Sequence, residues 1–543
     1  MRARSGIALF AAALCAATGA AAAGATGTVA AADATGRGSG AVSGESGAGP
    51  GRLLPGNLLV SGSYYVKDPS LVAGQTVLPP GCVSGCATAT AGGSYPQVFN
   101  NDVVDGSFGV TEPIFLDEIS TSGHLFARIG VPADELVTSF SSKSELALNL
   151  SSDARYVTFM GYAAKPGQLD VSNSNTPGVV DPTNPVTGTD YRAVATLSGT
   201  GQYTFTETNA YSGNNGRAAV LADGRFYTAG NAGNGGNPQP DGVILGAGAQ
   251  LITPSDLPEP AQTPGTPTPV GSFNIAELGD KPDKVGKDDN FRGLALHDNV
   301  LYYTKGSGGN GVNTVYFLDT TGKACPGGVG LPVPGAPLPT SGLSYNPATL
   351  QTTGLPSNMC VLKGFPTALK STTSFPFGLW FANPGTLYVA DEGNGDNTYS
   401  DGSYTTAASS GTAGLQKWVF DATAGEWKLA YTLQAGLKLG QPYHVPGYPA
   451  GVNAATGLPW APATDGLRNI TGRVGRDGTV TIWAITSTVS GSGDQGADPN
   501  KLVEITDPLT ATAPAAGEHF SPVRAAAFGE VLRGVSFTPG ARQ

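Results

Sequence analysis

The sequence is poor in charged residues, in histidine and in helix-forming stretches. Only 13% of its 543 residues are charged, and 30 Lys and Arg face 41 Asp and Glu, which gives a formal net charge of −11. So little positive charge argues against a general nucleic-acid binder, which needs a basic surface. Long Ala, Glu, Lys and Leu stretches at helical spacing are scarce after residue 50, so the composition is far from that of a helical protein.

Several catalytic signatures are also missing. The chain has no H-E-x-x-H sequence, and its folded region has no G-x-S-x-G nucleophile elbow. A G-x-G-x-x-G match at residues 306–311 is followed by "VNTVYFLD", which predicts a strand. A dinucleotide site needs a helix N-terminus at that point, so this match does not indicate a nucleotide. These motifs identify no reaction.

The N-terminus is typical of an exported protein. Arg2 and Arg4 precede an apolar run over residues 7–17, and small residues surround Ala23. We predict a cleaved signal peptide over residues 1–23, because the apolar run is too short to span a membrane and no second one follows. Residues 24–51 are rich in Ala, Gly, Ser and Thr and lack aromatics, so we expect disorder there. The folded domain then spans residues 52–543, in the periplasm or outside the cell, without membrane insertion.

Four cysteines remain in the predicted mature chain: Cys82, Cys86, Cys325 and Cys360. An even number in an exported protein favours two disulfides, with three possible connectivities. Sequence proximity favours Cys82–Cys86 and Cys325–Cys360. A zinc site is the rival interpretation, but "CVSGC" has no second close pair and the chain holds four histidines.

Glycine and proline, with 79 and 41 residues, are abundant and punctuate a repeated unit. The unit is an apolar strand, a tight turn, an aromatic-rich strand and a loop of Gly, Asn or Asp. Several of its turns are Asp-Gly or Asp-Asn, which tolerate the positive φ of a two-residue hairpin. The copies lie at residues 146–162, 216–236, 291–311, 375–396 and 472–494, and a sixth first strand at 532–540 ends the chain.

The repeat predicts an all-β fold, a β-propeller. Its period of about 77 residues leaves room for two more strands per unit, such as 313–319 and 359–365, and four-stranded units repeated radially form a propeller. The unpaired last strand predicts that N-terminal strands, in "NLLVSGSYYV", "PIFLDEI" and "HLFARIGV", complete its blade and close the ring. We predict six blades, with seven left open if one long interval contains another sheet.

One copy of the unit, "FPFGLWFANPGTLYVADEGNGD" at residues 375–396, resembles an NHL-type propeller repeat. The positions that carry the resemblance are Pro376, Gly378, Gly385, "LYVAD" at 387–391, Gly393 and Asn394. The resemblance is partial at residues 216–236 and 291–311. It implies a six-bladed propeller similar to NHL proteins or calcium-dependent lactonases. Because such families differ in chemistry on one scaffold, it assigns no catalytic residue.

Propeller geometry brings basic residues to one face. Residues just before the first strand and just after the second strand of each blade surround the channel mouth. Arg217, Arg292 and Arg533 share one register, and Arg468 and Lys143 fall close to it. This pattern predicts a cationic ring that binds a small anionic or carbohydrate-like ligand. The alternative is that each arginine ties neighbouring blades together.

The acidic loop after "LYVA" offers oxygen ligands at close spacing: Asp391, Glu392, Asn394 and Asp396. Such ligands suit Ca²⁺, although the spacing of an EF-hand loop is absent and solvated turns would use the same residues. A channel calcium would polarise an ester or lactone. His444, in a long loop, is a candidate general base, or else a packing residue among its aromatic neighbours.

Three functions therefore remain open. The first is an exported binding module for an anionic or carbohydrate-like ligand. The second is a metal-dependent hydrolase of the lactonase or phosphotriesterase type, or an NHL-like lyase. The third is a scaffold for protein partners. The sequence does not decide whether the chain is an enzyme.

Overall fold

The computed structural model describes most of the chain between residues 51 and 541. The described ranges are 51–66, 72, 75–78, 87–88, 90–91, 99–100, 109–168, 171–180, 188–231, 248–256, 260–263, 266, 268–281, 287–306, 311–369, 373–454, 456–491 and 496–541. They belong to one compact unit. The predicted signal peptide, the segment up to residue 50, Cys82 and Cys86 lie outside the described residues. No helix in the described ranges is long and apolar enough to cross a membrane.

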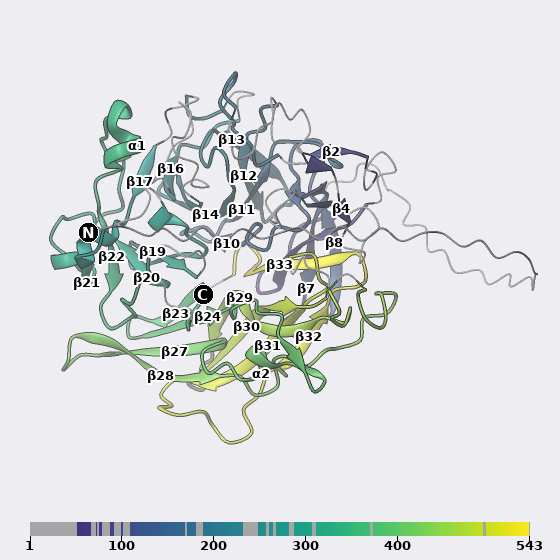
Figure 1. Ribbon diagram of the computed structural model, residues 1–543. Coiled ribbons are helices and arrows are strands. Elements are labelled where there is room, and N and C mark those ends of the chain that lie inside the picture. The colour runs from purple at the N-terminus through teal and green to yellow at the C-terminus, as the bar shows by residue number, and fades with distance from the viewer. Residues whose placement is uncertain are drawn as a thin grey trace, which may run out of the picture. The chain divides into compact units, whose positions relative to one another are not determined.

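The described chain forms a β-propeller of six antiparallel blades, arranged around a common centre in Figure 1. Blades are numbered here along the ring, and their strands are given from the centre outward. Blade 1 contains β33 (Glu530–Phe537), β1 (Leu58–Tyr64), β7 (Ile114–Ile119) and β8 (Leu125–Gly130). Blade 2 contains β10 (Asn149–Leu150), β11 (Tyr156–Tyr162), β12 (Arg192–Ser198) and β13 (Tyr203–Thr208). Blade 3 contains β14 (Gly216–Ala222), β15 (Arg225–Gly230), β16 (Ala249–Ile252) and β17 (Pro269–Gly271).

The other three blades follow the same plan. Blade 4 contains β18 (Leu294–His297), β19 (Val300–Lys305), β20 (Thr314–Leu318) and β22 (Met359–Leu362), with β21 (Val329–Gly330) added in parallel at its edge. Blade 5 contains β23 (Pro376–Asn383), β24 (Thr386–Asp391), β27 (Gly414–Asp421) and β28 (Glu426–Leu433). Blade 6 contains β29 (Ala463–Val474), β30 (Thr479–Val489), β31 (Lys501–Pro508) and β32 (Ser521–Ala525).

Short elements decorate this ring. The additional strands are β2 (Val77–Leu78), β3 (Ala87–Thr88), β4 (Thr90–Ala91), β5 (Phe99–Asn100), β6 (Thr111–Glu112), β9 (Thr138–Ser139), β25 (Tyr399–Ser400) and β26 (Ser403–Tyr404). The helices are α1 (Leu350–Thr353), α2 (Thr405–Ala408) and the 3-10 turns η2 (Ile275–Leu278), η3 (Lys287–Asp289), η4 (Pro326–Gly328) and η5 (Pro347–Thr349). The prediction of an all-β chain with six four-stranded blades is thus confirmed.

The two ends of the domain close the ring, as the unpaired last strand predicted. In blade 1 the C-terminal β33 pairs antiparallel with the N-terminal β1, with Val535 opposite Val60. β7 and β8 then extend the blade outward. Because the last strand pairs with the first strand of the domain, neither end is left without a partner strand to which another chain could add.

The hairpin turns have the backbone conformation that their Asp, Asn and Gly residues predict, with one exception. Asp223, Asp298 and Asn299 have positive φ, as two-residue hairpin turns require. The turn at Asp477 and Gly478 differs from the two-residue hairpin that we expected. Val474 pairs with Val480, so the connection is longer, and only Gly478 of the two has positive φ. A longer loop with glycine in the left-handed region also reverses the chain, because glycine meets no Cβ clash there.

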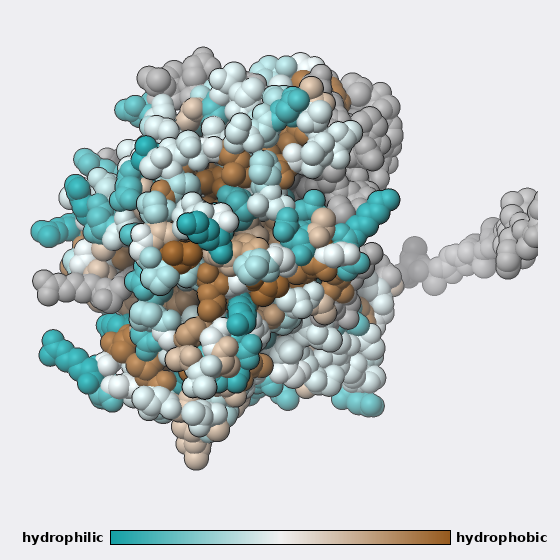
Figure 2. Space-filling view, turned by 90° about the vertical axis from the view of Figure 1, so that its left-hand side faces the viewer, coloured by the Kyte–Doolittle hydropathy of each residue, from teal (hydrophilic) through white to brown (hydrophobic). Residues whose placement is uncertain are grey.

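The hydrophobic core lies between the faces of successive blades. One cluster joins blades 3, 4 and 5 through buried residues such as Tyr227, Tyr303 and Leu387. Figure 2 shows the side of the unit that lies at the left of Figure 1, where apolar side chains form groups separated by hydrophilic ones. In blade 4 a disulfide joins Cys325 to Cys360, with their Cα atoms 5.5 Å apart. This predicted pair is confirmed.

Irregular pairing recurs near the start of the innermost strands. In β14, β23, β29 and β33 the pairing with the second strand skips a position at Arg217, Phe377, Arg468 and Arg533 respectively. An extra residue of this kind re-aims the side chain away from the ladder. Arg217, Arg468 and Arg533 therefore lie at irregular positions of the inner strands, whereas Arg292 precedes β18.

Candidate functional site

A plug crosses one end of the central channel, the end where the inner strands begin. We define the plug as residues 140–146, which connect blade 1 to blade 2. Successive residues of the plug contact different blades: Phe140 accepts from Arg533, Gly496 packs against Ser141, Asn215 donates to Ser142, Lys143 pairs with Glu392, and Arg292 donates to Ser144. These partners lie in or beside blades 1, 6, 3, 5 and 4. Only a segment that spans the channel can reach all of them.

Glu145 anchors the plug to its own blade. It is fully buried and accepts hydrogen bonds from Tyr162 Oη at 2.8 Å, Thr138 Oγ1 at 2.6 Å and the Ser139 amide at 3.1 Å. Burial raises the pKa of Glu145, and these donors lower it only in part. Asn215 Nδ2 is a fourth donor, at 3.3 Å. Four protein donors around one carboxyl fix the plug in place, because an unsatisfied buried carboxyl would be costly.

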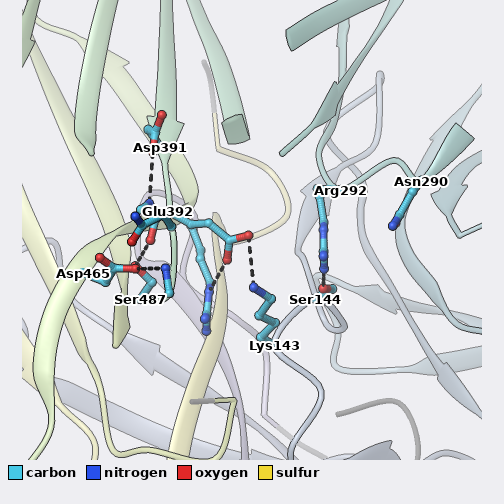
Figure 3. Close-up of polar contacts among 12 residues, drawn as sticks. Lys143, Ser144, Asn290, Arg292, Asp391, Glu392, Asp465 and Ser487 are labelled. Carbon is cyan, nitrogen blue, oxygen red and sulfur yellow. Dashed lines mark hydrogen bonds and ion pairs between the residues drawn. The ribbon is translucent and has the colours of Figure 1, made fainter. Parts of the chain in front are cut away.

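Three cations of the site surround one carboxylate. Glu392, which follows β24, lies 3.3 Å from Lys143 Nζ and 3.2 Å from Arg468 Nε. Figure 3 shows Lys143 pointing toward Glu392, with Arg292 on its other side. Glu392 and Arg468 are buried, whereas 34% of the Lys143 side chain is exposed. Lys143 therefore has the most exposed side chain of these three cations.

The pKa values in this cluster are strongly displaced. Burial alone would raise the pKa of Glu392, but the charges of Lys143, Arg468 and Arg292 outweigh burial and lower it to about 2. Burial lowers the pKa of Lys143 to about 8; Glu392 opposes this shift, while Arg292 and Arg468 add to it. One carboxylate thus does not balance the cations around it. Sites with such displaced values are often functional.

A second carboxyl beside this cluster holds a proton near neutral pH. Burial raises the pKa of Asp465 to about 7, and the neighbouring Glu392 charge adds to the effect. Asp465 Oδ2 accepts from the Gly395 amide at 2.8 Å, while its buried Oδ1 has no hydrogen-bond partner. A group that is half protonated near pH 7 can give or take a proton.

Further cations extend the cluster toward blades 3 and 4. Burial lowers the pKa of Lys305 to about 8, and the charges of Arg292 and Arg217 add to this effect against Asp288 and Asp289. The pKa of Asp289 is itself raised well above its ordinary value by burial. Lys305, Arg292 and Arg217 thus lie close enough to influence one another at this end of the channel.

The predicted arginines are all buried and engaged with neighbouring elements. Arg217 donates to Asn290 and, at 2.8 Å, to the Phe291 carbonyl of the chain leading to blade 4. Arg292 and Arg533 hold the plug, and Arg468 joins blade 6 to Glu392. The structure therefore gives each of them a joining contact. Of the five predicted cations, Lys143 is the one with a substantially exposed side chain.

The acidic loop does not bring its four predicted metal ligands together. Asp391 is buried and accepts from the amides of Phe375 at 2.8 Å and Gly393 at 3.0 Å. Glu392 faces cations, while Asn394 and Asp396 cap exposed turns through the Asp396 and Thr398 amides. Burial raises the pKa of Asp391 to about 6. Oxygens committed to N–H donors and cations do not fit a Ca²⁺ site here.

Other described groups offer no metal centre either. The one described group of three potential ligands is Asp319 with Cys325 and Cys360, whose sulfurs form the disulfide. His444 is exposed in the loop between β28 and β29 and makes no hydrogen bond to the described cluster residues. The structure thus does not bring His444 to Glu392.

Sequence reasoning found Lys143, Glu392 and Arg468 separately but missed what joins them. The plug was not predicted, because "FSSKSEL" has the composition of any surface loop. Ser487, whose hydroxyl donates to the Glu392 carbonyl at 2.6 Å, was also missed. In the sequence, the only feature that indicates the plug is the run of serines around a single lysine, which follows a strand.

No protein-family model matches this chain, and no curated protein does. Among solved structures, it is similar to the PQQ-bound aldose sugar dehydrogenase from Streptomyces coelicolor, with 12% identity, a TM-score of 0.32, and coverage of 84% of this chain and 99% of that one. An acylaminoacyl peptidase gives 8% identity and a TM-score of 0.28 over 81% of this chain and 50% of the peptidase. Drosophila Semaphorin 1a, extracellular domains 1-2, has 10% sequence identity and a TM-score of 0.24, with coverage of 81% of this chain and 88% of that one. Similarities this low do not bear on function.

Proposed function

We propose that this chain is an exported binding module whose plugged channel end takes an anionic, carbohydrate-like ligand, such as a sugar acid. The observation that carries the proposal is the charge imbalance at Glu392, where Lys143, Arg468 and Arg292 meet one carboxylate. An ammonium has three donors, so Lys143 can bind Glu392 and a ligand carboxylate together. A second anion would also offset the repulsion that lowers the pKa of Lys143.

Export of the chain is part of this proposal. It is supported by the Cys325–Cys360 disulfide, since such bonds persist mainly in oxidising compartments. A relationship to NHL-like propellers is also proposed. In the matching copy, a Cβ at Gly378 would collide with the Arg468 carbonyl, and Asp391 caps the turn at Gly393. Both motif positions therefore have a physical reason in blade 5.

Calorimetric titration with glucuronate, and with glucose as the uncharged control, tests the proposal. We expect saturable glucuronate binding that Lys143→Gln weakens at least about tenfold, equivalent to about 1.4 kcal/mol. Binding should weaken above pH 8, because Lys143 then loses its proton. Lys428→Gln, which removes an exposed lysine on β28, is the matched control. Equal binding of glucose, or unchanged binding by Lys143→Gln, would overturn the proposal.

A second candidate function, a lyase, is favoured by Asp465. Its pKa of about 7 and its unpartnered Oδ1 suit a general base. When a base removes the proton on the carbon next to a uronate carboxylate, the electron pair of that C–H bond forms a double bond and the glycosidic oxygen leaves. The new double bond absorbs ultraviolet light. Incubation with polygalacturonate, followed by absorbance, tests this function. Product formation that Asp465→Asn abolishes would support it, and no absorbance change would reject it for this substrate.

A further inference from the structure

The other end of the channel, where the hairpin turns of the blades lie, contains a cavity of about 840 Å³. This volume is within the range of ligand-binding sites in proteins. All six blades contribute to its wall: Ser536, Asn149, Val220, Asn299, Trp380 and Thr471 come from blades 1 to 6 in turn. The plug contributes no wall residue and bridges the channel farther along. This cavity is therefore separate from the Lys143–Glu392 cluster.

The charges of the cavity are opposite to those at the plug. Among the described residues of the wall there is no lysine or arginine, whereas Asp153 and Asp298 lie exposed at its rim. Carboxylates at the rim disfavour an anionic ligand, because like charges repel, and Arg155, 3.9 Å from Asp153, offsets only one of the two. A neutral occupant therefore suits the described wall better than an anionic one.

Three polar side chains of the wall are available for hydrogen bonds, while others, such as Asn149 and Ser151, already have partners. Within the described chain, the side chains of Thr471, Asn299 and Ser152 make no hydrogen bond, although all three line the cavity. A hydroxyl and an amide can each donate and accept hydrogen bonds. An alcohol group of a ligand also does both, so it can pair with either. A cation would need converging oxygens, whereas these mixed groups suit hydroxyls.

Trp380 supplies an aromatic surface in the same wall. Its ring packs against the backbone of Gly472, where a Cβ would lie 2.7 Å from Cε3, and its side chain remains partly exposed. Its indole N–H makes no hydrogen bond to the described chain. An indole offers an apolar face and one polar donor. Apolar C–H faces and hydroxyl edges alternate in a sugar ring, so Trp380 and Thr471 together match a saccharide.

We infer that this turn-side cavity is a second site, which binds a neutral mono- or disaccharide between Trp380, Thr471 and Asn299. The inference does not depend on the proposed anion site. The described wall of the cavity includes neither Lys143 nor Glu392, so each site can be removed without the other.

Titration with glucose, galactose, mannose, cellobiose and maltose, followed by tryptophan fluorescence and calorimetry, tests the inference. At least one of these sugars should bind saturably and change the fluorescence. Thr471→Val keeps the side-chain shape and should weaken that binding at least about tenfold. Lys143→Gln should leave it unchanged, which separates this site from the anion site.

Trp380→Phe keeps an aromatic ring but removes the indole donor, and we expect weaker binding with a native unfolding transition. Two outcomes would overturn the inference. One is the absence of saturable binding for all five sugars with folded protein. The other is binding that Thr471→Val and Trp380→Phe both leave unchanged.

Discussion

Lys143 and Glu392 are 249 residues apart in the sequence, and their charged groups lie 3.3 Å apart across the channel. The contact joins the plug to blade 5, on the far side of the ring from blade 2. It also places the accessible cation of the site beside its one fully ionised carboxylate. This pair is thus one of the contacts that hold the plug, and it contributes to the charge at this end of the channel.

Removal of the Glu392 charge should destabilise the domain strongly. In Glu392→Gln the buried Arg468 loses its ionic partner, and breaking such a pair costs about 3 kcal/mol or more. Urea unfolding followed by tryptophan fluorescence measures the change. The control is Asp421→Asn, which breaks the exposed pair with Lys428 and should have little effect. Equal stability of the two variants would contradict a role for Glu392 in holding the plug.

Asp465 should make stability fall as the pH rises from about 4 to 7. Its pKa is raised to about 7, so in this window the folded state keeps a proton that the unfolded state has lost. Asp465→Asn carries no such proton. The free energy of unfolding of the variant, relative to that of the wild type, should therefore increase as the pH rises from about 4 to 7. The increase should reach about 4 kcal/mol, since one pKa unit corresponds to about 1.4 kcal/mol.

Urea unfolding of both proteins at pH 4, 5.5 and 7 measures this difference. Asp401→Asn, at an exposed turn where Asn also tolerates positive φ, is the control. A stability difference that stays constant across the window would show that Asp465 does not bind a proton more tightly in the folded state.

A buried ion pair joins blades 5 and 6, and breaking it should destabilise the domain. Lys417 Nζ lies 2.8 Å from Asp507 Oδ2 with both side chains fully buried, and Tyr431 donates to Asp507 at 2.6 Å. Asp507→Asn keeps an acceptor for the tyrosine but leaves Lys417 uncompensated, which should cost about 3–5 kcal/mol. The double variant Lys417→Met/Asp507→Asn should recover much of that loss in urea unfolding. If it is less stable than Asp507→Asn, the assigned cost of an unpaired charge is wrong.

Reduction should loosen blade 4. The Cys325–Cys360 bond closes a segment of 35 residues, and loops of this size give about 3–4 kcal/mol of stabilisation. A reducing agent should therefore lower the Tm of the wild type. Cys325→Ala/Cys360→Ala should begin at the lower Tm and change less on reduction. A wild-type Tm that is insensitive to complete reduction would refute this contribution.

The sequence by itself determined the blades. Asp223-Gly224 and Asp298-Asn299 predict tight hairpins, because few residues tolerate positive φ, and both hairpins are present. The apolar strands around them, their spacing and the unpaired strand at 532–540 were enough to predict six units and a closed ring. These features depend on neighbours in the chain, which a single sequence records.

Only the tertiary structure decided the site. Arg217 and Arg533 look alike in the sequence, yet one joins blade 3 to blade 4 and the other holds the plug. Glu392 could have been a metal ligand until Lys143 and Arg468 were found beside it. Charge balance, burial and the path of residues 140–146 depend on contacts between segments hundreds of residues apart. Local patterns do not record such contacts, because many serine-rich loops would satisfy the same local chemistry.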